Sequence, residues 1–361
     1  MTKSLSLLSL FCLMIPLSIF SQEEEIIEEE DSDEVVDYSN LVQTTENKAY
    51  ASSKIIGQTP TKLVSLGYDY QTRYTLKTPE GPFVTTASPS ENEINRTTGA
   101  RFAINYPLFS KNYFLLNLGL NYAASNYAFS DPTTTASNPL SQALDNNGLR
   151  TLGFTATAFK PLNSKRFLIL QFGASLNGDY SFSNMQSLKY TRYSGAAIYG
   201  IKPNERKMWG LGISRTYLGG SLNYLPVYYL MYTAPSKNWG LEMLLPARFN
   251  YRRNVNSKNI LLAGWEIEGN TYRINNNDNR YTLPFNDMEL RRSELRFRIS
   301  WEHAITSQIW FSAQAGYRYN WSFDLDRGDF FRPFGDDTPF LAENDLGNPA
   351  YFNFSINWVS P

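Results

Sequence analysis

The chain has 361 residues, of which 42% are hydrophobic and 19% are charged, and its formal net charge is −1. A single cysteine and a single histidine exclude a disulfide-stapled scaffold and a Cys/His zinc site, and the balanced charge argues against a nucleic-acid-binding protein. The mean hydropathy of −0.38 excludes a membrane protein built from many helices.

Residues 1–21 have the pattern of a cleaved secretory signal peptide. Lys3 is a short positive region, residues 5–20 are an apolar run, and Ser21 precedes the expected cleavage site. The run is short for a transmembrane anchor, which needs about 20 apolar residues. Cys12 lies within the run, after bulky residues, which argues against a lipoprotein. No other stretch of the sequence is long and apolar enough for a spanning helix, so an exported, membrane-embedded chain must be a β-barrel.

Residues 22–60 are predicted to be an acidic and largely disordered periplasmic segment. Residues 23–37 contain ten acidic residues and no basic residue, whereas residues 41–361 carry a net charge of +8. The simplest interpretation is a solubilising leader. The alternative is a tail that docks on the mouth of its own barrel or on a basic periplasmic partner.

From about residue 61 the hydrophobic pattern has a period of two, which is typical of strands. In residues 112–122 one face carries Phe114, Leu116, Leu118, Leu120 and Tyr122. In residues 309–324 the apolar face is predicted to continue without a break from Ile309 through Phe311 to Phe323, with Ser312 and Asp324 on the opposite face. Strands of this length exceed the usual 5–6 residues or so of soluble sheets and suit tilted transmembrane strands. A soluble β-sandwich is the alternative, but it would not need such long apolar faces.

The expected strands number fourteen, an even number that places both ends of residues 61–361 in the periplasm. They cover residues 63–76, 97–107, 112–128, 148–161, 166–180, 188–202, 207–218, 222–234, 238–245, 247–254, 259–274, 289–304, 308–325 and 349–359. Short connections are assigned to the periplasm, and the long ones near 77–96, 129–147, 275–288 and 326–348 to the outside. Pro246 suits a tight turn; if its hairpin lies outside the wall, the count falls to twelve. The predicted fold class is therefore all-β, a transmembrane antiparallel up-and-down β-barrel formed by residues 61–361.

Tryptophans cluster near the proposed periplasmic ends of the strands, as in interfacial belts. These residues are Trp209, Trp239, Trp301, Trp310 and Trp358. The last strand is aromatic and alternating, like the signal read by the outer-membrane insertion machinery, although Pro361 replaces the usual terminal aromatic residue.

Residues 238–274 resemble an uncharacterised family of outer-membrane β-barrel proteins of Bacteroidota. The likeness lies in W-x-L-E-x-L-L-P-A at 239–247, in the Tyr251–Arg252 pair, and in G-W-E-I-E-G-N-T-Y-R-I at 264–274. The resemblance implies a barrel in a bacterial outer membrane. It implies no activity.

Charged residues are predicted to crowd into the lumen on neighbouring strands from 238 to 325. The set is Glu242, Arg248, Arg252, Glu266, Glu268, Arg292, Glu294, Arg296, Arg298, Glu302, Arg318 and Asp324. Strands from 63 to 180 offer mostly Asn, Gly, Ser and Thr to the lumen, so the charge is expected on one side. Opposite charges on adjacent strands can pair as a structural network, and they can also select solutes as rings of charge do in pores.

No catalytic, metal or cofactor site is predicted. His303, the only histidine, is expected on the lipid side near the periplasmic end, and arginines near Glu266, Glu268, Glu294 and Glu302 would keep these carboxylates ionised. The acidic stretch 324–345 lacks the ligand spacing of an EF-hand.

The leading functional hypothesis is a channel or porin-like pathway for small polar solutes, with outer-membrane lipid around it. The first alternative is a non-conducting anchor or assembly barrel that binds a periplasmic or membrane protein through its tail or loops. The second is uptake of hydrophobic molecules, with residues 22–60 as a hatch.

Overall fold

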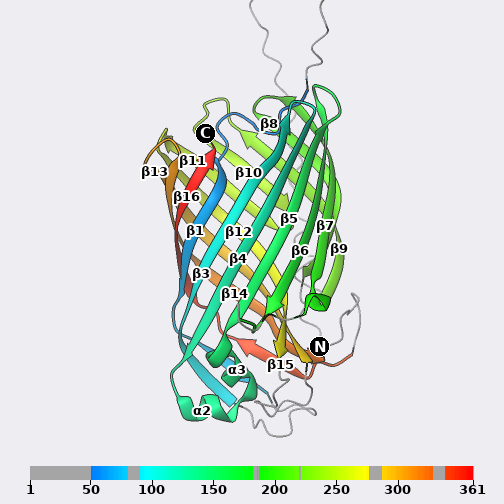
Figure 1. The fold of residues 1–361 in the computed structure, drawn as a ribbon. Helices are drawn as coiled ribbons and strands as arrows, with labels where there is room; N and C mark the ends of the chain where they lie inside the picture. Colours follow the sequence, from blue (N-terminus) through cyan, green and yellow to red (C-terminus); the bar gives the residue numbers. More distant parts are fainter. Residues whose placement is uncertain are drawn as a thin grey trace, which may run out of the picture. The chain divides into compact units, whose positions relative to one another are not determined.

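The computed structural model describes residues 50–79, 90–181, 185, 187–218, 221–275, 287–327 and 338–360. The predicted signal peptide and residues 22–49 of the predicted acidic segment lie outside this part. Within it, strands dominate, and fourteen of them form a closed antiparallel barrel in which β1 pairs with both β3 and β16 (Figure 1). This confirms the predicted fold class and the count of fourteen over twelve, with Pro246 in the turn between Leu245 and Arg248.

The wall strands are Thr61–Gln71 (β1), Ser90–Lys111 (β3), Phe114–Phe129 (β4), Leu149–Pro161 (β5), Arg166–Gly178 (β6), Arg192–Asn204 (β7), Lys207–Leu218 (β8), Ser221–Thr233 (β9), Trp239–Leu245 (β10), Arg248–Asn256 (β11), Asn259–Asn275 (β12), Asp287–Ala304 (β13), Ile309–Arg327 (β14) and Ala350–Ser360 (β16). Two short strands, Tyr74–Thr78 (β2) and Ala342–Leu346 (β15), continue β1 and β16 and pair with each other and with β3 and β14. We call the end with the short connections the turn end and the other the loop end.

Alternation along the strands gives the barrel two different surfaces. Leu66, Leu211, Ile299 and Ile356 are among the exposed apolar side chains of the outer face, while the neighbouring positions on each strand point inward. An apolar exterior around a polar interior is the arrangement of a transmembrane barrel. Trp301 and Trp358 are exposed on this outer face.

Trp310 departs from the predicted tryptophan belt. Its side chain points inward, is 7% exposed, and packs with Ile260, Ala304 and Val359 in a small cluster at the turn end. The reason is strand parity, because Ile309 and Phe311 on either side of it occupy the outer face. Proximity to a turn did not reveal on which face the ring lies.

The predicted apolar face of β14 is interrupted before its end. The β13–β14 ladder shifts register between Ser293 and Glu294, which opposes Ser322 to Ser293 but Asn320 to Glu294. Trp321 is the extra residue of this β-bulge, and beyond it the inward and outward positions of β14 are exchanged. Phe323 therefore points into the barrel, where it is 1% exposed, and Asp324 leaves the lumen set. The predictions for these two residues were wrong because one bulge exchanges the two faces.

The wall curls inward at the loop end. At the turn end five strands separate β6 from β12, yet Gly178 of β6 pairs in parallel with Arg273 of β12. Asp179 reinforces this junction, since its N–H donates to the Arg273 carbonyl (3.2 Å) and its carboxylate accepts from the Asn275 N–H (3.1 Å). Thr271 and Arg273, which lie on the outer face by alternation, are consequently buried.

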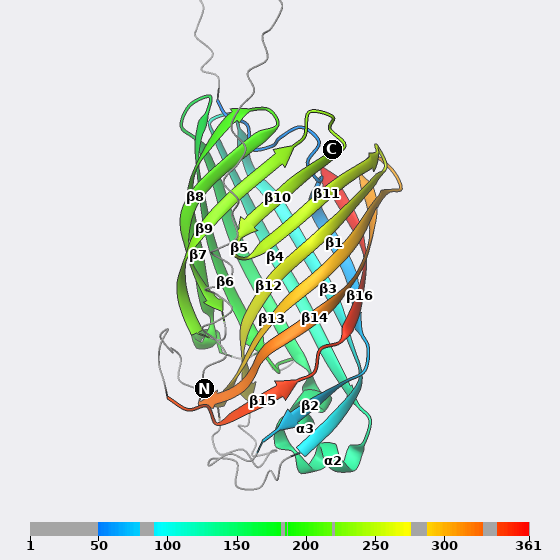
Figure 2. The same cartoon turned by 180° about the vertical axis from the view of Figure 1, so that it is seen from behind.

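The short hairpin β10–β11 leaves a notch in the wall between the tip of the hairpin and this junction (Figure 2). β9 pairs with β10 only over Tyr228–Thr233, and the β11–β12 ladder ends at the Arg248–Glu266 pair. Among the described strands, β9 therefore has a ladder partner over Leu222–Val227 on its β8 side only. We call this gap between β9 and β12 the notch.

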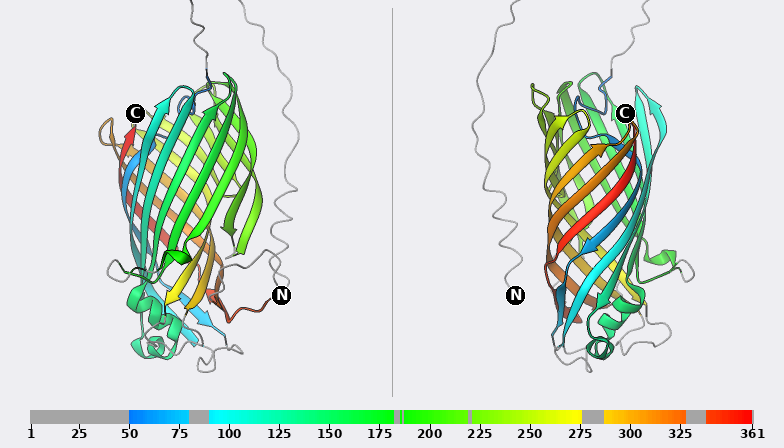
Figure 3. Two further views of the ribbon diagram at one scale, coloured as in Figure 1. Left: turned by 45° about the vertical axis from the view of Figure 1, so that its right-hand side comes forward. Right: turned by 90° about the vertical axis from the view of Figure 1, so that its left-hand side faces the viewer.

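Two helices, Pro132–Ser137 (α2) and Pro139–Asn147 (α3), lie at the loop end within the predicted loop 129–147 (Figure 3). The side chain of Asn138 caps α3 by accepting from the N–H groups of Leu140 (3.0 Å) and Ser141 (3.1 Å). A single 3-10 turn, Leu188–Tyr190 (η1), precedes β7. None of the helices in the described residues is long and apolar enough to span a membrane.

Candidate functional site

The structure brings the predicted lumen charges together on the inner face of β10 to β14. Alternation and register place every member of the predicted set except Asp324 on this face: Glu242, Arg248, Arg252, Glu266, Glu268, Arg292, Glu294, Arg296, Arg298, Glu302 and Arg318. These charges are not equally buried. They form layers along the barrel axis that differ in access to water.

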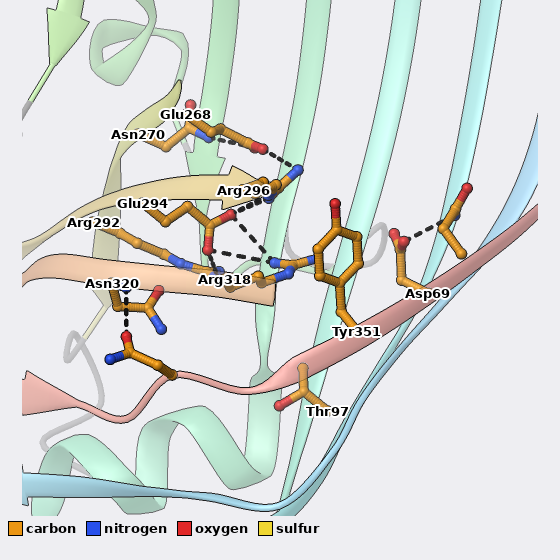
Figure 4. A network of polar contacts seen from close by, with 12 residues as sticks. Asp69, Thr97, Glu268, Asn270, Arg292, Glu294, Arg296, Arg318, Asn320 and Tyr351 are labelled. Carbon is orange, nitrogen blue, oxygen red and sulfur yellow. Dashed lines mark hydrogen bonds and ion pairs between the residues drawn. The ribbon is translucent and has the colours of Figure 1, made fainter. Parts of the chain in front are cut away.

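The deepest layer is centred on Glu294 of β13, whose side chain is 1% exposed (Figure 4). Its carboxylate accepts from Arg292 (2.7 Å), from Arg318 of β14 (3.3 Å) and from Arg296. The Arg318 guanidinium also lies over the Tyr351 ring, 4.8 Å from its centroid. A buried carboxylate surrounded by three arginines is a structural network, because each charge taken from water needs a partner.

The next layer faces the interior of the barrel and is only partly buried. Arg296 binds Glu268 across the β12–β13 ladder, and Arg298 binds Glu266. The side chains of Glu268 and Glu266 are 36% and 34% exposed, against 13% and 17% for the two arginines. We call the space that these four residues line the chamber.

A third layer lies towards the turn end. Arg252 is fully buried and donates to Glu242 (2.6 Å) and to the Thr233 hydroxyl (2.6 Å). Glu302 pairs with Lys62 of β1 (2.9 Å). Arg248, at the start of β11, does not belong to this layer: it is exposed and lies at the level of the chamber, in register with Glu266.

The wall of the chamber opposite β12 and β13 is mostly neutral. The inward positions of β4 to β8 carry residues such as Asn121, Thr155, Gln171, Ser194 and Ser214. At the level of the chamber, most of the charge is therefore carried by β12 and β13.

Three charged lumen residues were not predicted, and they lie on β1 and β3, beyond the pairing of β1 with β16 that closes the barrel. Lys62 and Asp69 lie on β1, and Arg101 of β3 donates to Asp69 (2.8 Å). Exposed Leu66 and Tyr68 fix the outer face of β1, so the alternation already placed Asp69 inside.

The loop end of the lumen is filled by an apolar core. Inward residues of eight strands pack there with Leu140, Ala143 and Leu144 of α3, and Leu76, Ile94, Ile274, Met288 and Leu290 are fully buried. Tyr127 and Tyr272 belong to the same core, and the Tyr127 hydroxyl accepts from Arg292 across the lumen (3.4 Å). Within the described residues, this core and the Glu294 layer close the axial route towards the loop end.

The turn end is crossed by residues 50–60, which we call the strap. Ala51 bonds to the β5–β6 turn, Ile56 to the β7–β8 turn, and Thr59 to the Glu242 carboxylate (3.0 and 2.7 Å). Ile55 is 5% exposed and packs into the barrel against Phe159, Phe167 and Met208. The strap belongs to the segment expected to be largely disordered, but it makes specific contacts around the mouth.

Two of the cavities in the described part of the chain border the lumen. The larger, of about 310 Å³, lies at the notch and includes Glu268 in its lining. The smaller, of about 250 Å³, lies near the β1–β16 seam and is lined by polar groups such as Lys62, Arg101, Gln314 and Asn353. The interior is therefore closed at both ends yet not filled between them.

His303 lies on the outer face of β13 as predicted. Its ring lies tilted against the Trp301 ring, with the centroids 5.3 Å apart, and its Nδ1 contacts the Asn259 side chain (2.9 Å). No group of three or more His, Cys, Asp or Glu residues in the described part of the chain is arranged to hold a metal ion.

Comparison with solved structures returned outer-membrane barrels of low similarity. An outer-membrane channel from Pseudomonas putida F1 is 11% identical, with a TM-score of 0.38 over 84% of this chain and 97% of that one. The toluene transporter TodX of P. putida is 9% identical, with a TM-score of 0.36 over 86% and 94%. The KdgM porin, solved with disordered oligogalacturonate, is 7% identical, with a TM-score of 0.32 over 82% and 99%.

At these TM-scores the likenesses carry no information on what passes through this barrel. No protein-family model and no curated protein matches the sequence. The resemblance to the Bacteroidota barrel family thus stays a prediction.

Proposed function

We propose that this barrel lies in a bacterial outer membrane and provides a pathway for small solutes through its charge-lined chamber. The short turns and the strap then face the periplasm, and the long loops and α3 face outside. The observation that carries the proposal is the layer formed by Glu266, Glu268, Arg296 and Arg298. These ionised side chains are partly exposed inside the barrel, between two closed ends.

The chamber also supports a mechanism of selection. Most of its charges come from β12 and β13 and face mostly neutral side chains of β4 to β8, so the field runs across the chamber. The two carboxylates are more exposed than the two arginines, which favours cations over anions at this layer. The strap closes the periplasmic mouth and is the element whose displacement admits solute.

Planar-bilayer recordings test the proposal. Full-length protein and an Ile55→Asp variant are compared, because a carboxylate cannot remain in the apolar cluster of Phe159, Phe167 and Met208. The variant is expected to conduct more than the parent and to prefer cations. Silence from both, in samples shown to be folded, would overturn the proposal.

A second candidate is the non-conducting anchor barrel. The observation that favours it is the apolar core at the loop end, which fills the lumen with residues such as Leu290, Phe323 and Leu325. Silence in the recordings would support this alternative, and the strap and tail would then be the segments to test for a protein partner.

A further inference from the structure

The larger cavity lies where the barrel wall is incomplete. It occupies about 310 Å³ at the notch, between the tip of the β10–β11 hairpin, the loop-end half of β9 and the residues of β12 beyond Glu266. This volume is at the lower end of the range of small-molecule sites, about 300–1,000 Å³. The cavity is therefore large enough for a small molecule.

The cavity reaches from the lumen into the wall. Ser194 and Ser214 of its lining lie on the inner faces of β7 and β8. Leu245 and Ile267, also in the lining, lie on the outer face by alternation. Side chains of both faces can line one cavity only where the strand ladder is interrupted, and the ladder between β9 and β12 is interrupted here.

The cavity offers an alternative to the closed axial route. Towards the loop end the lumen is filled by the apolar core. The cavity, in contrast, adjoins the chamber, because Glu268 lines the cavity and pairs with Arg296 in the chamber. An unpaired sheet edge at membrane depth is tolerated where it lines a cavity or is covered by protein. At the notch, the cavity that shares Glu268 with the chamber is therefore also lined by residues of the outer face, such as Ile267.

The lining combines apolar walls with one carboxylate. Leu225, Val227, Leu244, Pro246 and Ile267 are among its apolar lining residues. The Glu268 side chain is 36% exposed and accepts from Arg296 and from Asn270 (3.3 Å). Its carboxylate has lone pairs for a further donor.

We propose that this cavity is a binding site for a small apolar molecule with one hydrogen-bond donor, of the class of aromatic alcohols, and that it is the side exit of the barrel. The apolar body lies against Leu225, Val227 and Ile267, and the donor group bonds to Glu268. The exit role rests on the proposed passage function; the binding role does not.

Fluorescence titration of the full-length barrel in lipid nanodiscs tests the proposal, with 2-naphthol as the probe and naphthalene as its partner without a donor. Saturable binding is expected, about tenfold tighter for 2-naphthol because of the charge-assisted hydrogen bond. Glu268→Gln should abolish most of this preference and leave naphthalene binding unchanged.

Ala196→Phe should remove saturable binding of both probes by filling the cavity, since Ala196 belongs to its lining. The matched control is Ala103→Phe, which fills the smaller cavity instead and should leave binding intact. If Ala196→Phe fails to fold, Leu225→Trp replaces it. Saturable binding that survives a cavity-filling variant, or an absence of saturable binding in the parent, overturns the proposal.

Bilayer recordings on the same samples separate the two claims. Conductance without saturable probe binding would reject the binding site in the cavity and leave the proposed passage function standing. Saturable probe binding without conductance would support the binding site and reject its role as an exit.

Discussion

Arg192 and Glu289 form a buried ion pair between β7 and β13, two strands that are not neighbours in the wall. Arg192 lies on the inner face of β7, whereas Glu289 lies on the outer face of β13 by alternation. Such a contact requires the β7 edge to overlap the outside of β13 at the loop end. The overlap buries Arg291 as well, which donates to Glu289 (3.0 Å) and to Asp326 (2.9 Å).

Removing Arg192 and removing Glu289 should both destabilise the barrel, but by different amounts. Arg192→Leu leaves Glu289 paired with Arg291 and is expected to cost about 1–3 kcal/mol. Glu289→Leu leaves two buried arginines without this carboxylate and should cost more, about 3–5 kcal/mol. Urea unfolding in detergent micelles measures both. Equal costs would show that Arg291 does not share the carboxylate.

Glu294→Gln should be among the most damaging substitutions in the lumen. It leaves Arg292, Arg296 and Arg318 buried around a neutral amide, at an expected cost of about 3–5 kcal/mol. The matched control is Glu266→Gln, whose side chain is 34% exposed and whose loss water can compensate. Heat-modifiable migration on gels compares the two barrels, and equal stability would contradict a structural role for Glu294.

Asp179, just beyond the end of β6, should make stability depend on pH. Burial raises the pKa of this carboxyl to about 6, despite its bonds to Asn275 and Asn147. Because the folded state favours the protonated form, stability should fall as the pH rises from about 4 to about 6, by up to about 3 kcal/mol.

Thermal unfolding across this pH window measures the effect, with Asp179→Asn as the comparison. The variant should lose most of the slope, since its side chain cannot ionise. An unchanged slope would assign the pH dependence to another group.

Lys202→Met should loosen the strap without changing the wall. Lys202 is 3% exposed, and its ammonium group binds the Lys54 carbonyl (2.9 Å), the Ser52 hydroxyl and Glu205 (2.8 Å). Faster tryptic cleavage after Lys54 and more frequent openings in the bilayer are expected. Lys207→Met, an exposed lysine of the same hairpin, is the control and should behave like the parent. Identical cleavage in both variants would exclude Lys202 as an anchor of the strap.

Neutralising the chamber carboxylates should shift ion preference. Glu266→Gln combined with Glu268→Gln leaves Arg296 and Arg298 as the charges of the layer, so selectivity should move from cations towards anions. Reversal potentials in a salt gradient, recorded in the Ile55→Asp background, measure this shift. A conducting variant with unchanged reversal potential would show that solutes do not pass this layer.

The sequence by itself determined the barrel and the inner face that carries the charges, and it left the number of strands at fourteen or twelve. Alternation does this because side chains of a strand point to opposite sides at every step, so one exposed residue such as Leu66 assigns all its neighbours. The paired network on one wall followed from the same alternation and from the antiparallel order of the strands.

Only the tertiary structure decided how the interior is divided. A bulge reversed Phe323 and Asp324, the short β10–β11 hairpin opened the notch, and the curl brought Asp179 to β12. The strap across the mouth could not be predicted from the sequence either, because its contacts join residues such as Thr59 and Glu242 that lie far apart in the chain. Periodicity reports only which way a side chain points from its own strand, whereas closure and cavities depend on which distant strands meet.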